Sequence, residues 1–385
     1  MRFVDNRNKI GKYIPAVVFL IFIYGMALWF IFSPKPDYSS SEKRYLQKFP
    51  DANVEKVLSG EFGSEFETFF ADRFPQRNTW VGLNAYTALA EGNNGASGVY
   101  NCKNGYLINK PVSTENNLDK NIGAVADFAK SIDTPTTVML VPSTGYIVDD
   151  VLPTFHDKYN DDENISKISS TLSKDKIGFV DLRERFKSEY KNGSQLYYKT
   201  DHHWTTKGAY TGYQELCKAL GITPIDDSTL KKDSYPDFYG TTYSSSGFWL
   251  TPPDNIEIWN NPKNSDRNIS VKITEGANIK TSGSMYFTDH LKEDDKYPVF
   301  IDGNHALTEI TNTNAKNGTI LLIKDSFSHS LAPFLAENYS KVVLVDLRYY
   351  KESVSDLVTT YNPEQVVVLY GIDNLATDTD IVWLK

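Results

Sequence analysis

The carboxyl-terminal part of the chain alternates between strand-like and helix-like segments. Three runs rich in β-branched residues and two segments with apolar residues at helical spacing follow one another, at 319–323, 328–339, 341–347, 351–361 and 365–372. Apolar strands that each lead into a helix are typical of a parallel sheet covered by helices on both faces. This pattern predicts an α/β fold.

The same pattern begins earlier in the chain. Residues 136–144 and 177–182 have strand character, and the apolar residues of 118–128 recur at helical spacing. Residues 221–318 are rich in Ser, Asp, Tyr and Pro and predict an irregular region with only a few strands. We therefore expect one α/β catalytic domain over residues 96–385.

The amino-terminal segment predicts a membrane anchor. Residues 14–32 are apolar, uncharged and long enough to cross a bilayer as a helix. The preceding residues 1–13 carry four positively charged side chains, Arg2, Arg7, Lys9 and Lys12. Positive charges beside an apolar helix favour the cytoplasmic side, so we expect residues 1–13 to form a cytoplasmic tail. A cleaved signal peptide would have a shorter apolar core and a small-residue cleavage site. We expect an uncleaved signal anchor, followed by a linker and membrane-proximal helical segment over residues 33–95, with everything after the anchor outside the cytoplasm.

The charge of the chain excludes one class of partner, whereas its cysteines leave their pairing open. The net charge of −9 and the lack of a basic stripe with interleaved aromatic residues exclude nucleic acid as a partner. Cys102 and Cys217 are the only cysteines. Outside the cytoplasm they could pair, but the sequence does not decide whether they do. We expect no cofactor.

Polar residues follow each of the three carboxyl-terminal strands, where ligands bind in parallel sheets. Ser326 follows the first strand, at a turn into a helix whose amino terminus favours negative charge. Arg348 follows the second strand and Asn374 the third, and both side chains donate hydrogen bonds suited to a developing oxyanion. Ser326 is therefore a candidate nucleophile, although a serine at this position also fits a simple helix cap.

The segment "TDHHWT" supplies candidates for the base that a serine nucleophile needs. In an extended segment alternate side chains share a face, so Asp201 and His203 are expected to point together and His202 away from them. Asp201 would then orient His203 to accept the Ser326 proton. A metal site and ordinary packing are the alternatives. Diverging adjacent histidines and the lack of an HxH or HExxH pattern disfavour metal.

The same segment resembles the signature of the DHHW proteins, which are related to the alginate O-acetyltransferases and, with them, to the SGNH-type serine hydrolases and acyltransferases. The resemblance extends over most of the chain beyond the apolar segment. It includes "GEFGSEFETFFADRFPQRN" at 60–78, "SGVYNCKNGYLI" at 97–108, "IDGNHALTEI" at 301–310 and "LLIKDSFSHSLAPFL" at 321–335.

This resemblance implies roles for single residues. It makes Ser326 the nucleophile, in a "KDS" turn where the family has "GDS", with His203 as general base and Asp201 as its orienter. Because the Asp–His pair precedes the serine, the implied fold is a circularly permuted SGNH-hydrolase-like sheet. Arg348 matches an arginine that follows the next strand, and the G-I-D-N sequence at 371–374 occupies the place of the G-x-N-D block.

The implied function is extracytoplasmic O-acetylation of a cell-surface or secreted polysaccharide through an acetyl-serine, as in exopolysaccharide biosynthesis. A membrane-bound O-acyltransferase partner would supply the acetyl groups. Tyr198, Trp204 and Trp249 are candidates for an acceptor groove, although core packing explains each of them equally well. Two other functions fit the same sequence: a carbohydrate acetyl esterase with the same triad, and a non-catalytic polysaccharide-binding or assembly factor.

Overall fold

The computed structural model describes residues 3–112 and 117–384 and divides into two compact units, residues 1–84 and 85–385. The first unit begins with α1 (Phe3–Phe32), and Arg2 of the expected basic tail lies outside the described residues. Within α1, Gly11–Phe32 is a 22-residue stretch long and apolar enough to cross a membrane. The unit also contains β1 (Tyr38–Ser39), β2 (Arg44–Tyr45), α2 (Val54–Ser59) and α3 (Glu61–Asp72), and α4 (Arg77–Ala90) extends across the boundary.

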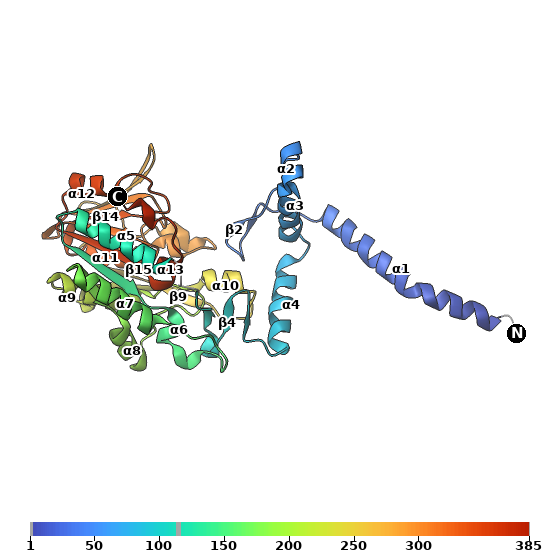
Figure 1. The fold of residues 1–385 in the computed structure, drawn as a ribbon. Helices are drawn as coiled ribbons and strands as arrows, with labels where there is room; N and C mark the ends of the chain where they lie inside the picture. Colours follow the sequence, from blue (N-terminus) through green and yellow to red (C-terminus); the bar gives the residue numbers. More distant parts are fainter. Residues whose placement is uncertain (1–2, 113–116, 385) are drawn as a thin grey trace. The chain divides into compact units, whose positions relative to one another are not determined.

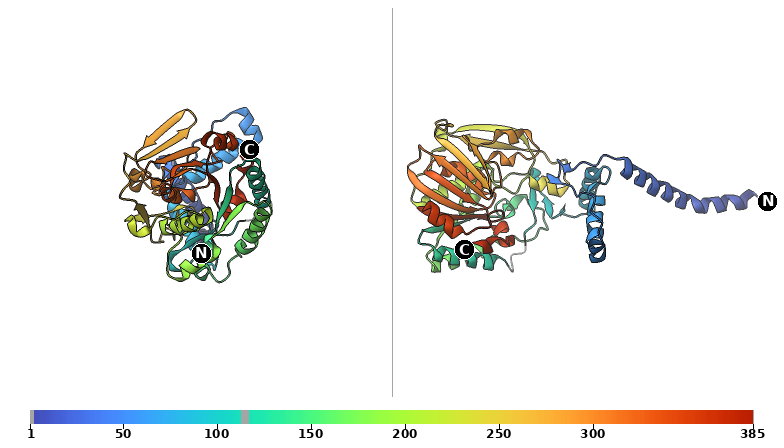
Figure 2. Two further views of the ribbon diagram at one scale, coloured as in Figure 1. Left: turned by 90° about the vertical axis from the view of Figure 1, so that its left-hand side faces the viewer. Right: turned by 90° about the horizontal axis from the view of Figure 1, so that it is seen from above.

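The second unit is built on an eight-stranded sheet with the strand order β11-β10-β12-β14-β13-β15-β6-β7. Figures 1 and 2 show this unit as a ribbon. Its strands are β6 (Thr136–Val141), β7 (Gly178–Asp181), β10 (Ile269–Glu275), β11 (Asn278–Ser282), β12 (Leu307–Asn312), β13 (Asn317–Lys324), β14 (Tyr339–Val345) and β15 (Gln365–Gly371). The five strands from β14 to β7 are parallel to one another, which confirms the predicted α/β fold. The three strands at the other edge are antiparallel and come from the region predicted to be irregular.

Helices cover both faces of this sheet. Strand β13 shows why: Ile320 and Leu322 belong to one core cluster, Leu321 and Ile323 to another, and all four are fully buried. The first cluster packs under α9 (Thr206–Leu220) and α11 (Ser328–Leu335). The second packs under α5 (Leu118–Ser131), α7 (Asp161–Lys174), α12 (Val354–Tyr361) and α13 (Ile372–Thr377).

Smaller elements complete the second unit. A three-stranded sheet contains β3 (Gly95–Ala96), β4 (Val99–Asn101) and β5 (Leu107–Asn109), and a ribbon contains β8 (Lys231–Phe238) and β9 (Asp254–Asn260). The remaining helices are α6 (Thr144–Ile147), α8 (Arg183–Lys191) and α10 (Thr241–Ser246), with 3-10 turns η1 (Lys103–Gly105), η2 (Asp149–Val151), η3 (Asp227–Thr229), η4 (Thr288–Lys292), η5 (Tyr297–Val299) and η6 (Ile381–Trp383).

Candidate active site

Ser326 lies in the turn between β13 and α11, and the carboxylate of Asp325 shapes this turn. Asp325 Oδ1 accepts the Phe327 N–H at 2.9 Å. Its Oδ2 accepts the Gly371 N–H and the Asn374 side-chain amide, each at 2.7 Å. Among the residues that the structure describes, no side chain caps α11, so Ser326 does not act as a helix cap. Asp325 instead joins the serine turn to the end of β15 and leaves the Ser326 hydroxyl for other contacts.

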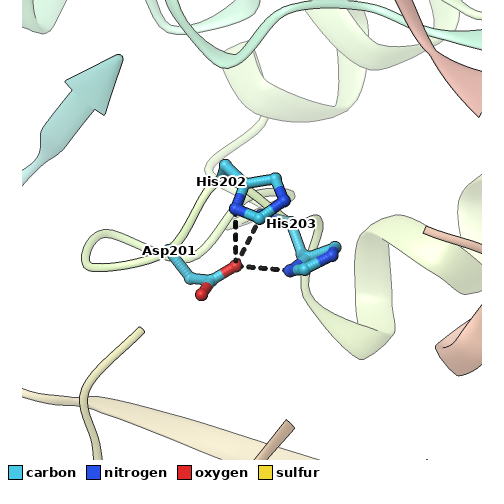
Figure 3. A group of neighbouring side chains, drawn as sticks. All are labelled: Asp201, His202 and His203. Atoms are coloured by element: carbon cyan, nitrogen blue, oxygen red, sulfur yellow. Dashed lines mark hydrogen bonds and ion pairs between the residues drawn. The ribbon is translucent and has the colours of Figure 1, made fainter. Parts of the chain in front are cut away.

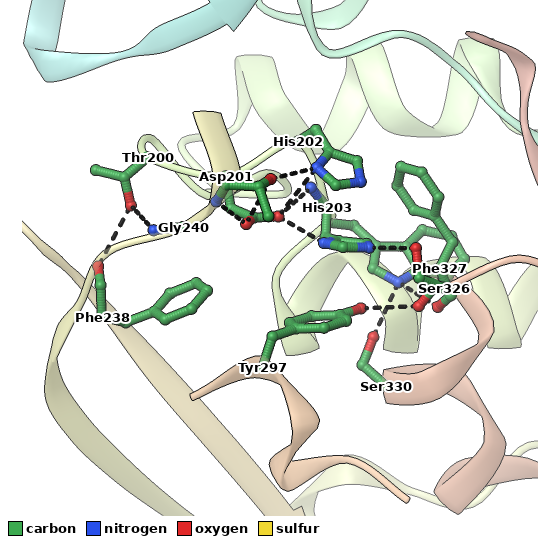
Figure 4. Close-up of polar contacts among 12 residues, drawn as sticks. Thr200, Asp201, His202, His203, Phe238, Gly240, Tyr297, Ser326, Phe327 and Ser330 are labelled. Carbon is green, nitrogen blue, oxygen red and sulfur yellow. Dashed lines mark hydrogen bonds and ion pairs between the residues drawn. The ribbon is translucent and has the colours of Figure 1, made fainter. Parts of the chain in front are cut away.

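The structure brings Ser326, His203 and Asp201 into one hydrogen-bonded chain (Figure 4). Ser326 Oγ lies 2.7 Å from His203 Nε2, and His203 Nδ1 lies 2.5 Å from Asp201 Oδ1. All three are buried: 8% of Ser326, 4% of His203 and 2% of Asp201 is exposed. The order and distances are those that a serine nucleophile, its base and the orienting carboxylate require.

The segment that carries the two histidines is a turn rather than an extended strand. Asp201 Oδ1 also accepts the backbone N–H of His203, two residues on, at 2.8 Å, a hydrogen bond that bends the chain. His202 therefore stacks on His203, with ring centroids 3.9 Å apart, and its Nδ1 lies 3.6 Å from Asp201 Oδ1 (Figure 3). The prediction that His202 points away from this pair is wrong.

Because of this turn, divergence of the two histidines is no longer an argument against a metal site. The ligand atoms of Asp201, His202 and His203 all lie within 4.8 Å of one another, so the histidines do not diverge. However, the shared carboxylate oxygen is hydrogen-bonded to the backbone N–H and ring Nδ1 of His203. These contacts are satisfied within the protein and fit a His–Asp pair.

Asp201 is held as a carboxylate. Its Oδ2 accepts hydrogen bonds from the Thr241 N–H at 2.6 Å and the Thr241 hydroxyl at 3.1 Å. Burial alone would raise the pKa of Asp201, but attraction to His203 and His202 and the hydrogen bonds outweigh burial and hold this pKa well below its usual value. The negative charge needed to support a protonated His203 is therefore present at neutral pH.

Tyr297, in η5, holds His203 from the other side. The two rings stack nearly in parallel, with centroids 4.0 Å apart and an interplanar angle of 12°. The Tyr297 hydroxyl donates to the backbone carbonyl of Ser326 at 3.2 Å. Figure 4 shows the His203 ring between His202 and Tyr297. The imidazole that bonds Ser326 is thus fixed on both faces.

Two of the three aromatic candidates for an acceptor groove are core residues. Trp204 is fully buried, and its indole N–H donates to the Phe327 carbonyl at 3.0 Å and to Ser330 Oγ at 2.9 Å. Tyr198 is 1% exposed and packs edge-on against Phe238. Core packing, the alternative explanation for these candidates, therefore fits both side chains, although Tyr198 is also among the residues that line a second cavity. Trp249 is half-buried.

Arg348 lies at the end of β14 and is held by a buried carboxylate. Its Nε lies 2.9 Å from Asp346 Oδ1 and its Nη2 2.6 Å from Asp346 Oδ2. Lys324, 1% exposed, donates to the same Oδ2 at 2.9 Å. Burial would raise the pKa of Asp346, but its contacts with these two cations lower it. In the described part of the chain, Arg348 makes no hydrogen bond to Ser326.

A small cavity of about 50 Å³ opens beside this group of residues. His202, Phe327 and Asn374 form part of its wall, so the cavity reaches the turn that carries Ser326. The predicted oxyanion donor Asn374 thus lies near the serine turn, with its amide donating to Asp325.

Asp373 lies at another wall of the cavity and forms an acidic pair with Asp161. Ser143 donates its N–H to Asp161 at 2.7 Å and its hydroxyl to Asp373 at 3.1 Å. Burial and the neighbouring Asp161 raise the pKa of Asp373 to about 7, and burial raises that of Asp161 to about 6. Asp373, the third residue of the G-I-D-N sequence, thus forms part of the cavity wall.

The two cysteines are free and buried. Burial raises the pKa of Cys102 and that of Cys217 to about 12, so neither is a thiolate at neutral pH. No thiol chemistry is indicated.

Sequence reasoning missed Asp325, Thr241 and Tyr297. Asp325 is adjacent to the candidate nucleophile, and its position before the serine was a usable signal. Thr241 and Tyr297 lie within residues 221–318, where no periodic pattern marks them. Only the fold brings these two residues to the histidines.

Comparisons with known proteins agree with the sequence resemblance. The described fold is similar to a DHHW family protein from Eubacterium siraeum, with 17% identity, a TM-score of 0.63, and coverage of 75% of this chain and 95% of that chain. It is also similar to PatB1 from Bacillus cereus, solved with a sulfonyl adduct, with 21% identity, a TM-score of 0.61, and coverage of 74% and 97%. No curated protein matches the chain significantly. Residues 109–345, more than half of the chain, match the family model described as DHHW protein, and the chain therefore belongs to the DHHW family.

Proposed function

We propose that this protein is an extracytoplasmic O-acetyltransferase that moves an acetyl group from Ser326 to a hydroxyl of a cell-surface or secreted polysaccharide. The observation that carries the proposal is the continuous chain of hydrogen bonds from Ser326 through His203 to Asp201. The sequence resemblance to the alginate O-acetyltransferases supports acetyl transfer of the SGNH serine type as the reaction.

In the first half of the reaction, Ser326 Oγ attacks the carbonyl carbon of the acetyl donor. His203 Nε2, at 2.7 Å, takes the hydroxyl proton as the new C–O bond forms. When the bond to the leaving group breaks, His203 returns this proton to the leaving group. Asp201 stabilises the imidazolium that exists between these two proton transfers.

In the second half, a sugar hydroxyl takes the place of the leaving group. His203 removes its proton while the sugar oxygen attacks the acetyl carbonyl carbon. The bond to Ser326 Oγ then breaks, and His203 returns the proton to that oxygen. The products are an acetylated sugar and the free serine, so each turnover restores the starting enzyme.

Two donors are proposed for the oxyanion that forms in each half. No protein acceptor for the Ser326 N–H is found within residues 3–112 and 117–384, so this donor remains for substrate. The Asn374 amide has two protons and gives one to Asp325, which leaves the second. Arg348 contributes positive charge from the end of β14, and this charge also helps to lower the pKa of His202.

The proposed location follows from the amino-terminal helix. Residues 14–32 act as an uncleaved signal anchor, with residues 1–13 in the cytoplasm and the domain over residues 96–385 outside it. The 22-residue apolar stretch in α1 supports this arrangement. Because acetyl-coenzyme A is cytoplasmic, a membrane-bound O-acyltransferase partner would pass acetyl groups outward to Ser326.

Product analysis with a chromogenic acetyl ester as donor tests the proposal. The full-length protein in detergent should release the chromophore and place acetyl on an added oligosaccharide, and Ser326→Ala should do neither. Acetate alone, with every oligosaccharide tried, would assign the site to an acetyl esterase. Full transfer by Ser326→Ala would remove the serine mechanism.

A further inference from the structure

His202 has no part in the proton transfers described above, yet it lies in the cavity wall beside them. Its ring stacks on His203, its side chain is 29% exposed, and it lines the cavity next to Phe327. Its Nδ1 is bonded to the Thr241 hydroxyl at 2.7 Å. Its Nε2 has no partner among the described residues, and Figures 3 and 4 show this nitrogen turned away from Asp201.

The neighbours of Nδ1 determine which nitrogen carries the proton. Thr241 Oγ1 lies 3.1 Å from Asp201 Oδ2, and because an ionised carboxylate can only accept, the Thr241 O–H donates this hydrogen bond. The oxygen of Thr241 must then accept a hydrogen bond from the N–H at His202 Nδ1. Asp201 Oδ1, 3.6 Å from the same nitrogen, also favours an N–H there over a lone pair. His202 is therefore protonated on Nδ1, and its Nε2 carries a lone pair.

The His202 ring is uncharged at neutral pH. Burial and the adjacent His203 lower the pKa of His202 to about 4, and the nearby carboxylate only partly opposes this effect. A neutral imidazole with a free Nε2 accepts a hydrogen bond and does not donate one from that atom. The cavity wall thus offers an acceptor next to the hydrogen-bonded chain of Ser326, His203 and Asp201.

We infer that His202 is a substrate-binding residue whose Nε2 accepts a hydrogen bond from a second hydroxyl of the sugar acceptor. This inference rests on the proposed acetyl transfer. The attacking hydroxyl has a single proton and must give it to His203, so the hydroxyl that donates to His202 is a different one. The substrate class is therefore an acceptor that has a hydroxyl beside the one that is acetylated.

Two small alcohols, used as acetyl acceptors, test the role of His202 without knowledge of the polysaccharide. Ethylene glycol has a second hydroxyl beside the attacking one, and ethanol is about the same size without it. With a chromogenic acetyl ester as donor, the full-length protein should transfer acetyl to ethylene glycol about tenfold better per hydroxyl than to ethanol, the size of one neutral hydrogen bond. His202→Phe keeps a ring over His203 but has no Nε2, and it should lower this preference to about one.

Thr241 provides matched variants. Thr241→Ser keeps the hydroxyl that sets the His202 proton and should keep the preference. Thr241→Val removes this hydroxyl and should lower the preference. Because the readout is a ratio between two acceptors, a general loss of activity does not change it. A wild-type ratio near one, or an unchanged ratio in His202→Phe, would overturn the inference, as expected if His202 only packs or donates to the oxyanion.

A measurement without turnover separates this inference from the proposed function. In ¹⁵N spectra of histidine-labelled protein, His202→Phe identifies the His202 signals. We expect Nδ1 to carry the proton and the unprotonated Nε2 to shift when ethylene glycol is added. A proton on Nε2, or no shift, contradicts the role of His202 whatever the activity. Absence of acetylated product with a correct Nε2 signal contradicts acetyl transfer alone.

Discussion

Ser326 Oγ and His203 Nε2 lie 2.7 Å apart, although 123 residues separate them in the chain. Trp204 explains how the two segments meet. Its buried indole N–H donates to the Phe327 carbonyl and the Ser330 hydroxyl, next to the serine turn. The residue that follows the two histidines thus attaches their segment to the turn that carries the serine.

Removal of the negative charge on Asp201 should disable this pair. We expect Asp201→Asn to lower kcat for acetyl ester turnover by about 10³- to 10⁴-fold, because the amide favours the wrong His203 tautomer. Steady-state kinetics checks this, with Asp289→Asn, at an exposed residue, as the control. Activity within tenfold of wild type in Asp201→Asn would show that the carboxylate does not orient His203.

Stacking by Tyr297 should matter more than its hydroxyl. Tyr297→Phe loses the bond to the Ser326 carbonyl but keeps the ring over His203, so kcat should fall by only about threefold. Tyr297→Leu loses the parallel contact and should lower kcat by more than tenfold. Melting temperatures of both variants identify any loss through unfolding. Equal kcat in the two variants would contradict the positioning role of the ring.

Lys324 should be important for stability. Lys324→Met leaves Asp346 buried with one cation fewer, and such a loss costs about 3–5 kcal/mol of unfolding free energy. Lys341, about one-third exposed and 3.7 Å from Glu309, is the matched control, and Lys341→Met should cost at most about 1 kcal/mol. Urea unfolding followed by tryptophan fluorescence measures both. Similar costs for the two variants would contradict this account of the buried pair.

The acidic pair of Asp373 and Asp161 should make stability depend on pH. Because the folded-state pKa of Asp373, about 7, lies above its ordinary value, folding takes up a proton, and stability falls as the pH rises from about 4 to 7. The carboxylate of Asp161 and the hydroxyl of Ser143 are the groups that face it.

Asp373→Asn stays neutral and should therefore be more stable than wild type at pH 8, with a smaller difference at pH 5. Thermal melts at both values measure this. Asp127→Asn, at an exposed residue, should show no such divergence. A constant difference between Asp373→Asn and wild type across this range would mean that Asp373 is ionised throughout.

The sheet was predictable where strands are buried on both faces. Strands β13, β14 and β15 each contain a run of consecutive apolar residues, and this pattern does not depend on distant parts of the chain. Strands β10 to β12 lie in the region for which a few strands were predicted without positions. Buried and more exposed residues alternate along β10, and β11 is mostly exposed at the sheet edge, so their hydrophobic signal is weak.

The site was predictable in its residues and less so in its local shape. Asp201, His203 and Ser326 were found from spacing, strand ends and resemblance. The turn that brings His202 over His203 depends on one hydrogen bond from the His203 backbone N–H to the Asp201 carboxylate. The assumption that side chains alternate along an extended segment does not allow for such a turn. Tyr297 and Thr241 could not be predicted from the sequence, because they contact this segment only through the tertiary fold.

Detection of the acetyl-enzyme tests the central claim most directly. The full-length protein is mixed with an acetyl ester, quenched in acid within the first turnovers, digested and examined by peptide mass spectrometry. The account predicts one acetyl group on Ser326, which disappears when an acceptor sugar is added before the quench and is absent in Ser326→Ala. Turnover with Ser326 unmodified, or an acetyl group that forms on another residue and passes to the sugar, would contradict it.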